Sequence, residues 1–225
     1  MREAVEKKVL GENDRVASAL RLRFRERGIL CVNLISSPGS GKTTLLERTL
    51  AALPRDSAVA VLTGDIQTDN DAQRLARFGF PVRQITTGGT CHLDARMIER
   101  ALDALPLAES SLLFVENVSN LVCPASYDLG EAEKIVLLSV AEGEDKPLKY
   151  PGIFHRASLM VLTKTDLLPH VEFDAAAAKE NARRIHPQIE IIELSCRTGD
   201  GFDQWVAWLG AKGRQYRAEI AAPAR

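Results

Sequence analysis

The chain has 225 residues, with 29 Lys or Arg against 30 Asp or Glu, so its formal net charge is only −1. This balance excludes a whole-chain field that would recruit nucleic acid or an anionic membrane, and the absence of a long apolar run predicts a cytoplasmic protein. Four cysteines are too few for a disulfide scaffold and favour free thiols or metal ligands.

The length predicts a single domain over 1–225, because a second full domain would need a longer chain. Within it, Val16, Leu20 and Phe24 recur at a spacing of four, which predicts an amphipathic leading helix inside 1–28. The Ala- and Arg-rich stretch 212–225 is expected to fray as a tail.

Between these ends, in the core 29–211, short apolar runs alternate with helical patterns. The runs cover Ile29–Ile35, Val59–Leu62, Val82–Ile85, Leu112–Val115, Ile135–Val140, Leu159–Leu162 and Ile189–Leu194. Such alternation predicts an α/β fold: a doubly wound, mostly parallel sheet of about seven strands with helices on both faces. Ligands of such sheets bind at the carboxyl ends of the strands, so the residues after each run deserve inspection.

A phosphate-binding loop follows the first predicted strand, in the order strand, loop and helix. Its glycines allow the positive φ angles that turn backbone amides inward, Lys42 offers a charge to the β- and γ-phosphates, and the Thr43 hydroxyl can bind Mg²⁺. The consensus has glycine where Ser36 stands. An ordinary Gly-rich turn would instead leave Lys42 at a helix start, where the helix dipole disfavours a cation. The predicted nucleotide-binding residues of this loop are Gly39, Ser40, Gly41, Lys42, Thr43 and Thr44.

A guanine-reading motif is predicted after the strand that ends at Leu162. The run Thr163-Lys164-Thr165-Asp166 is similar to the NKxD motif of GTPases, and a carboxylate at Asp166 can accept hydrogen bonds from guanine N1–H and the 2-amino group. Thr163 replaces the usual Asn, which bears on affinity rather than on base preference. The alternative is a turn that merely ends a strand. With the loop Ser195–Gly199, the predicted base contacts are Lys164, Asp166, Cys196 and Arg197.

Two acidic residues end apolar runs and point to the phosphate face. Glu116 is expected to hold Mg²⁺ through water, and Asp65 to orient the attacking water or share the metal shell, so Lys42, Asp65 and Glu116 are the predicted catalytic residues. The predicted magnesium ligands are Thr43, Asp65, Glu116 and either Asp69 or Asp71. Each of the acidic residues in this set could instead cap a helix.

A second metal site is predicted from two loops. Cys91 and His92 follow one strand, and Cys123 comes seven residues after Glu116. Thiolates and an imidazole suit zinc or nickel, and three ligands leave the shell open for a second copy of the chain to complete. The alternative for a lone cysteine is a small buried hydrophobe, which we expect of Cys31.

The runs SSPGSGKTTLLERTL, TGGTCHLDARMI, ENVSNLVCPASYDLGE, EGEDKPLKYPGIF and TKTDLLP resemble the nickel-incorporation GTPases of NiFe-hydrogenase maturation, within the SIMIBI class of P-loop proteins. The resemblance implies a homodimer tightened by GTP, slow hydrolysis, and nickel or zinc held by Cys91, His92 and Cys123 at the dimer interface. It also implies a nickel-chaperone protein and the hydrogenase large subunit as partners, and a lysine of the loop 146–149 reaching nucleotide on the partner chain.

The sequence therefore predicts a GTP-hydrolysing metallochaperone in which the short link from Glu116 to Cys123 couples nucleotide state to metal binding. Ser119 stands where relatives have glycine, and it would blunt the switch if a positive φ were required there. Three alternatives remain: a GTP-gated docking scaffold, the urease nickel-delivery GTPase, which typically has a Cys-Pro-His motif, and a small-molecule kinase. Asp166 counts against the kinase.

Overall fold

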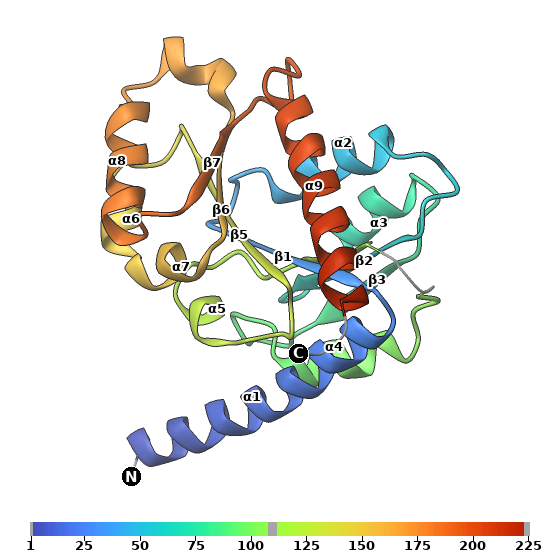
Figure 1. The fold of residues 1–225 in the computed structure, drawn as a ribbon. Coiled ribbons are helices and arrows are strands. Elements are labelled where there is room, and N and C mark those ends of the chain that lie inside the picture. The colour runs from blue at the N-terminus through green and yellow to red at the C-terminus, as the bar shows by residue number, and fades with distance from the viewer. Residues whose placement is uncertain (1, 108–111, 223–225) are drawn as a thin grey trace.

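Seven parallel strands form the centre of the structure, a computed structural model that describes residues 2–107 and 112–222 (Figure 1). In chain order they are β1 (Leu30–Ser36), β2 (Val59–Asp65), β3 (Val82–Thr86), β4 (Leu112–Glu116), β5 (Glu133–Ser139), β6 (Leu159–Thr163) and β7 (Glu190–Glu193). The strand order across the sheet is β3-β2-β4-β1-β5-β6-β7. The predicted doubly wound α/β sheet is confirmed.

Strand β1 is the central strand because its neighbours β4 and β5 pair with it on either side. All seven of its residues are buried, which explains why its sequence is apolar without alternation. The register places Leu34 opposite Glu116 of β4. The phosphate loop after β1 and the acid that ends β4 therefore emerge side by side at the carboxyl edge of the sheet.

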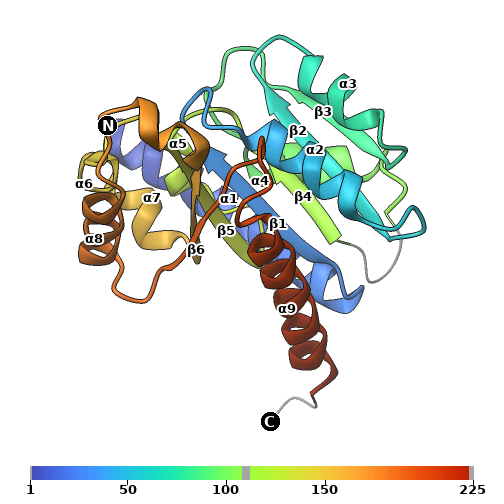
Figure 2. The ribbon, with the colours of Figure 1, turned by 90° about the horizontal axis from the view of Figure 1, so that it is seen from above.

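Helices cover both faces of the sheet (Figure 2). One face packs on α2 (Lys42–Ala52), α3 (Asn70–Ala76) and α9 (Phe202–Ala221). The opposite face packs on α1 (Arg2–Glu26), α4 (Ala95–Leu102), the short α5 (Cys123–Ser126), α7 (Pro151–Arg156) and α8 (Ala175–Ile185). Two short pieces, α6 (Lys146–Lys149) and the 3₁₀ helix η1 (Thr165–His170), lie in loops at the carboxyl edge. None of the helices in the described residues has the length and apolar character needed to cross a membrane.

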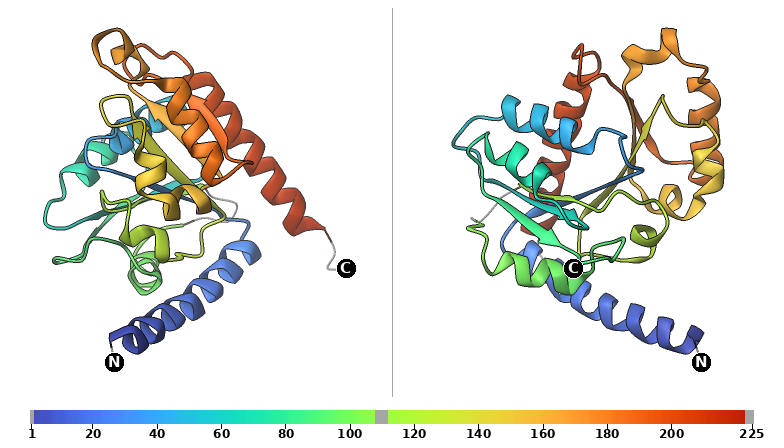
Figure 3. Two further views of the ribbon diagram at one scale, coloured as in Figure 1. Left: turned by 90° about the vertical axis from the view of Figure 1, so that its left-hand side faces the viewer. Right: turned by 180° about the vertical axis from the view of Figure 1, so that it is seen from behind.

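Helix α1 packs through its second half, while its first half projects beyond the sheet (Figure 3). Val16, Leu20 and Phe24, the residues that predict the helix, are each at most 4 % exposed. Gly28 follows with a φ of 66°, which ends the helix as a left-handed residue.

The carboxyl-terminal stretch differs from the prediction of a frayed tail. Helix α9 continues through Gly210 and Gly213 to Ala221, and only 223–225 of the predicted tail lie outside the described residues. Trp205 and Trp208 on its inner side are buried against the sheet. This packing fixes the first turns, and the Ala, Lys, Gln and Arg residues that follow are strong helix formers.

Candidate nucleotide pocket and metal centre

The phosphate loop connects β1 to α2. Gly39 and Gly41 have φ angles of 76° and 96°, and a side chain at either position would meet no atom within 4 Å. Backbone conformation rather than crowding therefore requires glycine. Ser36 is the last residue of β1 and does not have a positive φ, which explains how serine replaces the consensus glycine.

Lys42 is held by two uncharged hydroxyl groups. Its Nζ donates to Ser36 Oγ at 2.9 Å and to Ser119 Oγ at 2.8 Å, and the residue is 5 % exposed. Burial lowers the pKa of Lys42, partly offset by the nearby carboxylates of Glu116 and Asp71. A buried ammonium that forms no carboxylate ion pair among the described residues is suited to a phosphate ligand. Ser119 has no positive φ, so the condition under which serine would carry a backbone penalty at this position is not met.

Thr43 and Glu116 form the pair that sequence reasoning assigned to Mg²⁺. Thr43 Oγ1 donates to Glu116 Oε1 at 2.6 Å, whereas the buried Glu116 Oε2 has no hydrogen-bond partner among the described residues. Burial raises the pKa of Glu116 to about 7, against the lowering effects of Lys42 and Thr43. A buried carboxylate oxygen without a donor, next to a threonine hydroxyl, fits a hard divalent cation.

Asp65 and Asp69, two of the predicted magnesium ligands, are engaged in local hydrogen bonds. Asp65 Oδ1 accepts from the backbone amides of Gln67 and Thr68, and these bonds lower the pKa of Asp65 although burial acts to raise it. Asp69 occupies the N-cap position of α3 and its carboxylate accepts from Gln73 Nε2 at 2.9 Å. Asp69 therefore occupies the N-cap position without a capping bond from its side chain, and Asp65 bonds to amides of the loop that precedes α3 instead of capping a helix.

Arg74 reaches the phosphate loop, although the sequence did not single it out. It pairs with Glu47 at 2.7 Å and with Asp71 at 3.4 Å, and its Nη2 lies 3.5 Å from the Thr44 hydroxyl. Asp71, the other candidate magnesium ligand, is therefore held near the phosphate loop by its ion pair with Arg74. The only signal in the sequence for this contact is the position of Arg74 in α3, close after the predicted magnesium ligands Asp69 and Asp71.

The predicted base-contact residues line a cavity of about 280 Å³ next to the phosphate loop. Its walls are formed by Gly41, Thr44, Thr163, Lys164, Asp166, Leu167, Cys196 and Arg197. Lys164, with a φ of 60°, is the non-glycine residue in left-handed conformation among the described residues. The structure thus places all four predicted base-contact residues at one pocket.

Asp166 is positioned by Ser195, a residue missing from the predicted set. Ser195 Oγ donates to Asp166 Oδ1 at 2.6 Å and accepts from the backbone amides of Arg197 and Thr198. The Arg197 guanidinium is 83 % exposed and 4.0 Å from Asp166, so it contributes little to holding the carboxylate. Burial raises the pKa of the Cys196 thiol to about 11, which leaves its backbone as the useful part of that residue.

The predicted metal ligands come together at the same edge of the sheet. The ligand atoms of Cys91, His92 and Cys123 all lie within 4.8 Å of one another, and the two sulfur atoms are 3.0 Å apart. Each residue is partly exposed, and burial lowers the pKa of His92, which favours the neutral imidazole that binds metals. The arrangement can hold a thiophilic divalent ion with part of its shell open.

Two further residues support these ligands, and sequence reasoning missed both. The rings of His92 and Tyr127 stack with centroids 3.8 Å apart and an interplanar angle of 28°. Asn120 Nδ2 donates to the Cys91 carbonyl at 3.2 Å. Such supporting contacts orient metal ligands, but an aromatic residue four positions after Cys123 carries no recognisable motif.

Lys146 contacts the phosphate loop of its own chain. Its Nζ donates to Ser37 Oγ at 3.0 Å and pairs with Glu142 at 3.1 Å. Lys149 instead pairs with Asp145. The reach of this loop to a partner's nucleotide stays a prediction.

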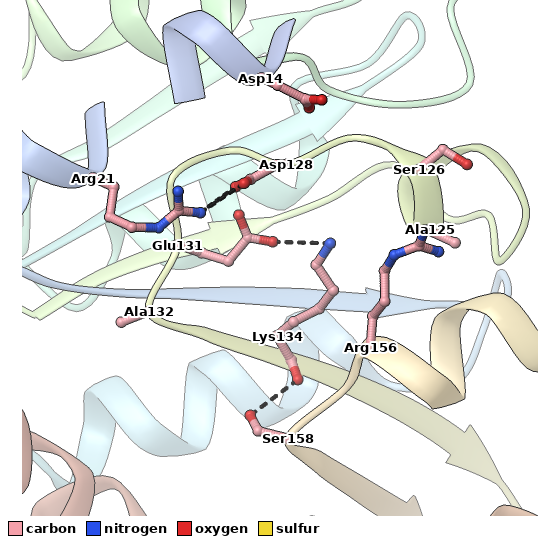
Figure 4. A pocket seen from close by; sticks show the side chains of 10 residues that line it. All are labelled: Asp14, Arg21, Ala125, Ser126, Asp128, Glu131, Ala132, Lys134, Arg156 and Ser158. Carbon is pink, nitrogen blue, oxygen red and sulfur yellow. Dashed lines mark hydrogen bonds and ion pairs between the residues drawn. The ribbon is translucent and has the colours of Figure 1, made fainter. Parts of the chain in front are cut away.

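A larger cavity, of about 480 Å³, lies between α1, α5 and the start of β5 (Figure 4). Four of its charged side chains are paired with each other: Arg21 with Asp128, and Lys134 with Glu131. None of the predicted site residues lines it. Size alone therefore does not indicate the functional site in this molecule.

Comparisons with known proteins find similar sequences over most of the chain. The family profile described as "CobW/HypB/UreG, nucleotide-binding domain" matches residues 30–193. The hydrogenase maturation factor HypB of Azotobacter vinelandii is 54 % identical over 219 residues, covering 97 % of this chain and 72 % of the relative. HypB of Escherichia coli (strain K12) is 55 % identical over 205 residues, covering 91 % and 71 %.

Solved structures extend the comparison. The crystal structure of HypB from Helicobacter pylori in complex with nickel superimposes with a TM-score of 0.85 at 40 % identity, covering 95 % of this chain and 99 % of that one. The signal recognition particle 54 kDa protein from Aeropyrum pernix K1, in complex with GDP, matches with a TM-score of 0.53 at 13 % identity. The second likeness concerns the fold alone and agrees with the SIMIBI arrangement.

Proposed function

Because the chain belongs to the CobW/HypB/UreG nucleotide-binding family and, within it, to the HypB hydrogenase maturation factors, we propose that it hydrolyses GTP and delivers nickel during NiFe-hydrogenase maturation. One observation carries the proposal. The pair Thr43–Glu116 and the cluster Cys91–His92–Cys123 lie at the same carboxyl edge of the sheet, and the loop after β4 contributes to both.

The nucleotide is GTP, bound with its phosphates on the loop after β1 and its base in the cavity beside Asp166. Lys42 is already desolvated and held by hydroxyl groups, so it contacts phosphate oxygens without reorganising ion pairs. Thr43 and Glu116 hold Mg²⁺, which supplies positive charge to the β- and γ-phosphate oxygens when bound. Asp65 orients the attacking water. To do so, its carboxylate gives up the hydrogen bonds that it accepts from the amides of Gln67 and Thr68.

Turnover is slow in this proposal because, within the part of the chain that the structure describes, the arginine that contacts the phosphate loop is already paired with carboxylates and is not available to stabilise the transferred phosphoryl group. Arg74 is the guanidinium group nearest to the loop in the contacts described above, and it is paired with Glu47 and Asp71. Slow hydrolysis suits a protein whose nucleotide acts as a timer for another event.

Nickel is the cargo, bound by the two thiolates and the His92 imidazole. The Helicobacter pylori relative solved in complex with nickel supports nickel over zinc. Three ligands leave a coordination position open, and a homodimer with this edge at its interface completes or bridges the shell. An open shell also allows a nickel chaperone to load the ion and the hydrogenase large subunit to receive it.

Two alternatives to nickel delivery for hydrogenase are a docking scaffold and nickel delivery to urease. A docking scaffold would assemble partners in response to GTP without binding nickel at Cys123. Relatives from Helicobacter pylori are named hydrogenase/urease maturation factors, at 42 % identity over 212 residues, so urease is a second possible recipient of the nickel. Partner proteins determine which enzyme receives the nickel, so GTP hydrolysis and nickel binding by this chain are the same for either recipient.

The test measures GTP hydrolysis and the affinity for nickel and zinc on the wild type, Cys123→Ala and Cys31→Ala, with GDP or a non-hydrolysable GTP analogue and Mg²⁺. Cys31 is buried in β1 and serves as the matched thiol control. We expect Cys123→Ala alone to lose nickel binding, and wild-type affinity to differ between nucleotide states. Nickel binding that survives Cys123→Ala, or that is indifferent to nucleotide, would favour the scaffold.

A further inference from the structure

Asn117 lies at the meeting point of the nucleotide pocket and the metal centre. It follows Glu116 directly, and its backbone amide donates to the Leu34 carbonyl of β1 at 3.0 Å. The residue is 1 % exposed, so its amide group needs partners inside the protein.

The Asn117 side chain finds those partners in segments that the two sites share. Its Oδ1 accepts from the Leu93 amide at 3.2 Å and from the Val118 amide at 2.9 Å. Leu93 follows the metal ligand His92, and Val118 precedes Ser119, whose hydroxyl binds Lys42. One side chain therefore connects the end of the strand that bears Glu116 with the loop that bears His92.

The remaining side of the Asn117 amide is also fixed. Its Nδ2 donates to Asn33 Oδ1 at 3.3 Å, and Asn33 Nδ2 donates to Glu131 Oε1 at 3.1 Å. Asn33 is fully buried in the central strand, and Glu131 is in turn paired with Lys134 (Figure 4). The Asn117 side chain accepts from Leu93 through its oxygen and donates to Asn33 through its nitrogen, so this network determines the orientation of its amide group.

Leu93 also packs against β2, the strand that ends at Asp65 of the nucleotide pocket. A side chain at Gly64, which precedes Asp65 in β2, would approach the Leu93 side chain to 2.8 Å. Leu93 is fully buried, and packed interiors transmit small displacements because they contain little free volume. Movement of either acidic strand end, at Asp65 or Glu116, therefore presses on the residue next to His92.

We propose that Asn117 is a positioning residue that couples nucleotide state to the metal ligands, by holding the Leu93 amide to the strand end of Glu116. This route reaches His92 and is separate from the covalent link between Glu116 and Cys123. The inference rests on the proposed function, because it assigns a residue to the coupling on which nickel delivery depends.

The experiment compares nickel dissociation constants with GDP and with a non-hydrolysable GTP analogue plus Mg²⁺, in the wild type, Asn117→Ala and Asn13→Ala. Asn13 is the matched control: it is a buried asparagine whose Oδ1 accepts from the Ala95 amide at 2.9 Å, yet it lies in α1. We expect a wild-type ratio of at least about 5 between the two states. Asn117→Ala should bring this ratio close to 1 and change nickel affinity with GDP by less than about threefold, while Asn13→Ala keeps the ratio.

The outcomes separate the two proposals. A wild-type ratio of 1 overturns the coupling and this inference together. A wild-type ratio that Asn117→Ala retains, or that Asn13→Ala lowers equally, overturns the role of Asn117 and leaves nickel delivery standing. If Asn117→Ala does not fold, amide hydrogen exchange on the wild type decides: protection of Leu93 should change with nucleotide state, and an unchanged Leu93 amide refutes the role.

Discussion

The hydroxyl of Thr163 donates a 2.7 Å hydrogen bond to the backbone carbonyl of Ser40, so the base-reading loop after β6 is tied to the phosphate loop after β1. Thr163 is 2 % exposed, and its partner lies 123 positions away in the chain. The two halves of the nucleotide pocket are thereby held in one geometry before nucleotide binds, which reduces the ordering cost of binding.

Removing this hydroxyl should weaken nucleotide binding without changing base preference. Thr163→Val leaves the Ser40 carbonyl without its donor, and we expect GDP affinity to fall by about 3- to 10-fold, as for one hydrogen bond. Thr163→Ser keeps the hydroxyl and is the control. Calorimetric titration with GDP and ADP measures both quantities, and equal affinities for the Val and Ser variants would contradict the assignment.

Asp166→Asn should alter which base is recognised. The amide group of asparagine keeps one acceptor oxygen but donates at the other position, so guanine loses one partner while the 2-oxo group of xanthine gains one. We expect GDP affinity to fall by at least about 100-fold and the affinity for xanthosine diphosphate to rise. Arg197→Ala is the control, since the exposed guanidinium lies 4.0 Å from Asp166. Tight GDP binding by Asp166→Asn would remove Asp166 from base recognition.

Tyr127 should support nickel affinity through its stack on His92. Replacing it with leucine removes the aromatic contact that restrains the imidazole, and we expect nickel affinity to fall by about 2- to 10-fold, the equivalent of about 0.5–1.5 kcal/mol. Tyr127→Phe keeps the ring and should retain most of the affinity. Competition with a metal indicator measures the change. A loss of the same size in both variants would point to the phenol group instead of the stack.

Asp128→Asn should destabilise the protein in a pH-dependent way. Arg21 of α1 donates to both carboxylate oxygens of Asp128, at 2.6 and 2.7 Å; burial acts to raise the pKa of Asp128, but the Arg21 and Gly130 hydrogen bonds lower it overall. A lowered folded pKa gives stability that is present above the ordinary value of 3.8 and is lost as the pH falls below it. Because both side chains are more than a third exposed, we expect a loss of only about 0.5–1 kcal/mol at pH 7.

Urea unfolding at pH 7 and pH 3 measures this difference, which should shrink at the lower pH. The control is Asp103→Asn. Asp103 is 73 % exposed and lies 3.8 Å from Arg23, which is in α1 like Arg21. A difference between wild type and Asp128→Asn that is constant with pH would show that the charge of Asp128 is not responsible.

The sheet could be predicted from the sequence because each strand carries its own signal. Buried parallel strands such as β1 are apolar on both faces, and the phosphate loop is read from residues that are neighbours in the chain. The contacts that join the sites could not be predicted this way. Asn117 and Leu93 are 24 positions apart, and a buried asparagine after a strand resembles any turn residue.

The frayed tail predicted for the end of the chain is wrong because local propensity does not include the tertiary packing that fixes α9. At Ser119, the positive φ on which a blunted switch would depend is absent. Ser119 takes an ordinary backbone conformation, and its hydroxyl serves Lys42. The glycines of α9 are carried within a helix whose indole side chains pack on the sheet.

The 3.0 Å approach of Cys91 and Cys123 joins two loops whose cysteines are 32 positions apart. An ion bound there is therefore a reversible cross-link, which closes a long loop of the chain and favours the folded state over the unfolded one. Stability should rise with the logarithm of free nickel, by about 2.7 kcal/mol at 100 times the dissociation constant. Release of nickel would therefore destabilise this edge of the protein, so nickel delivery and increased local motion of the two loops would occur together.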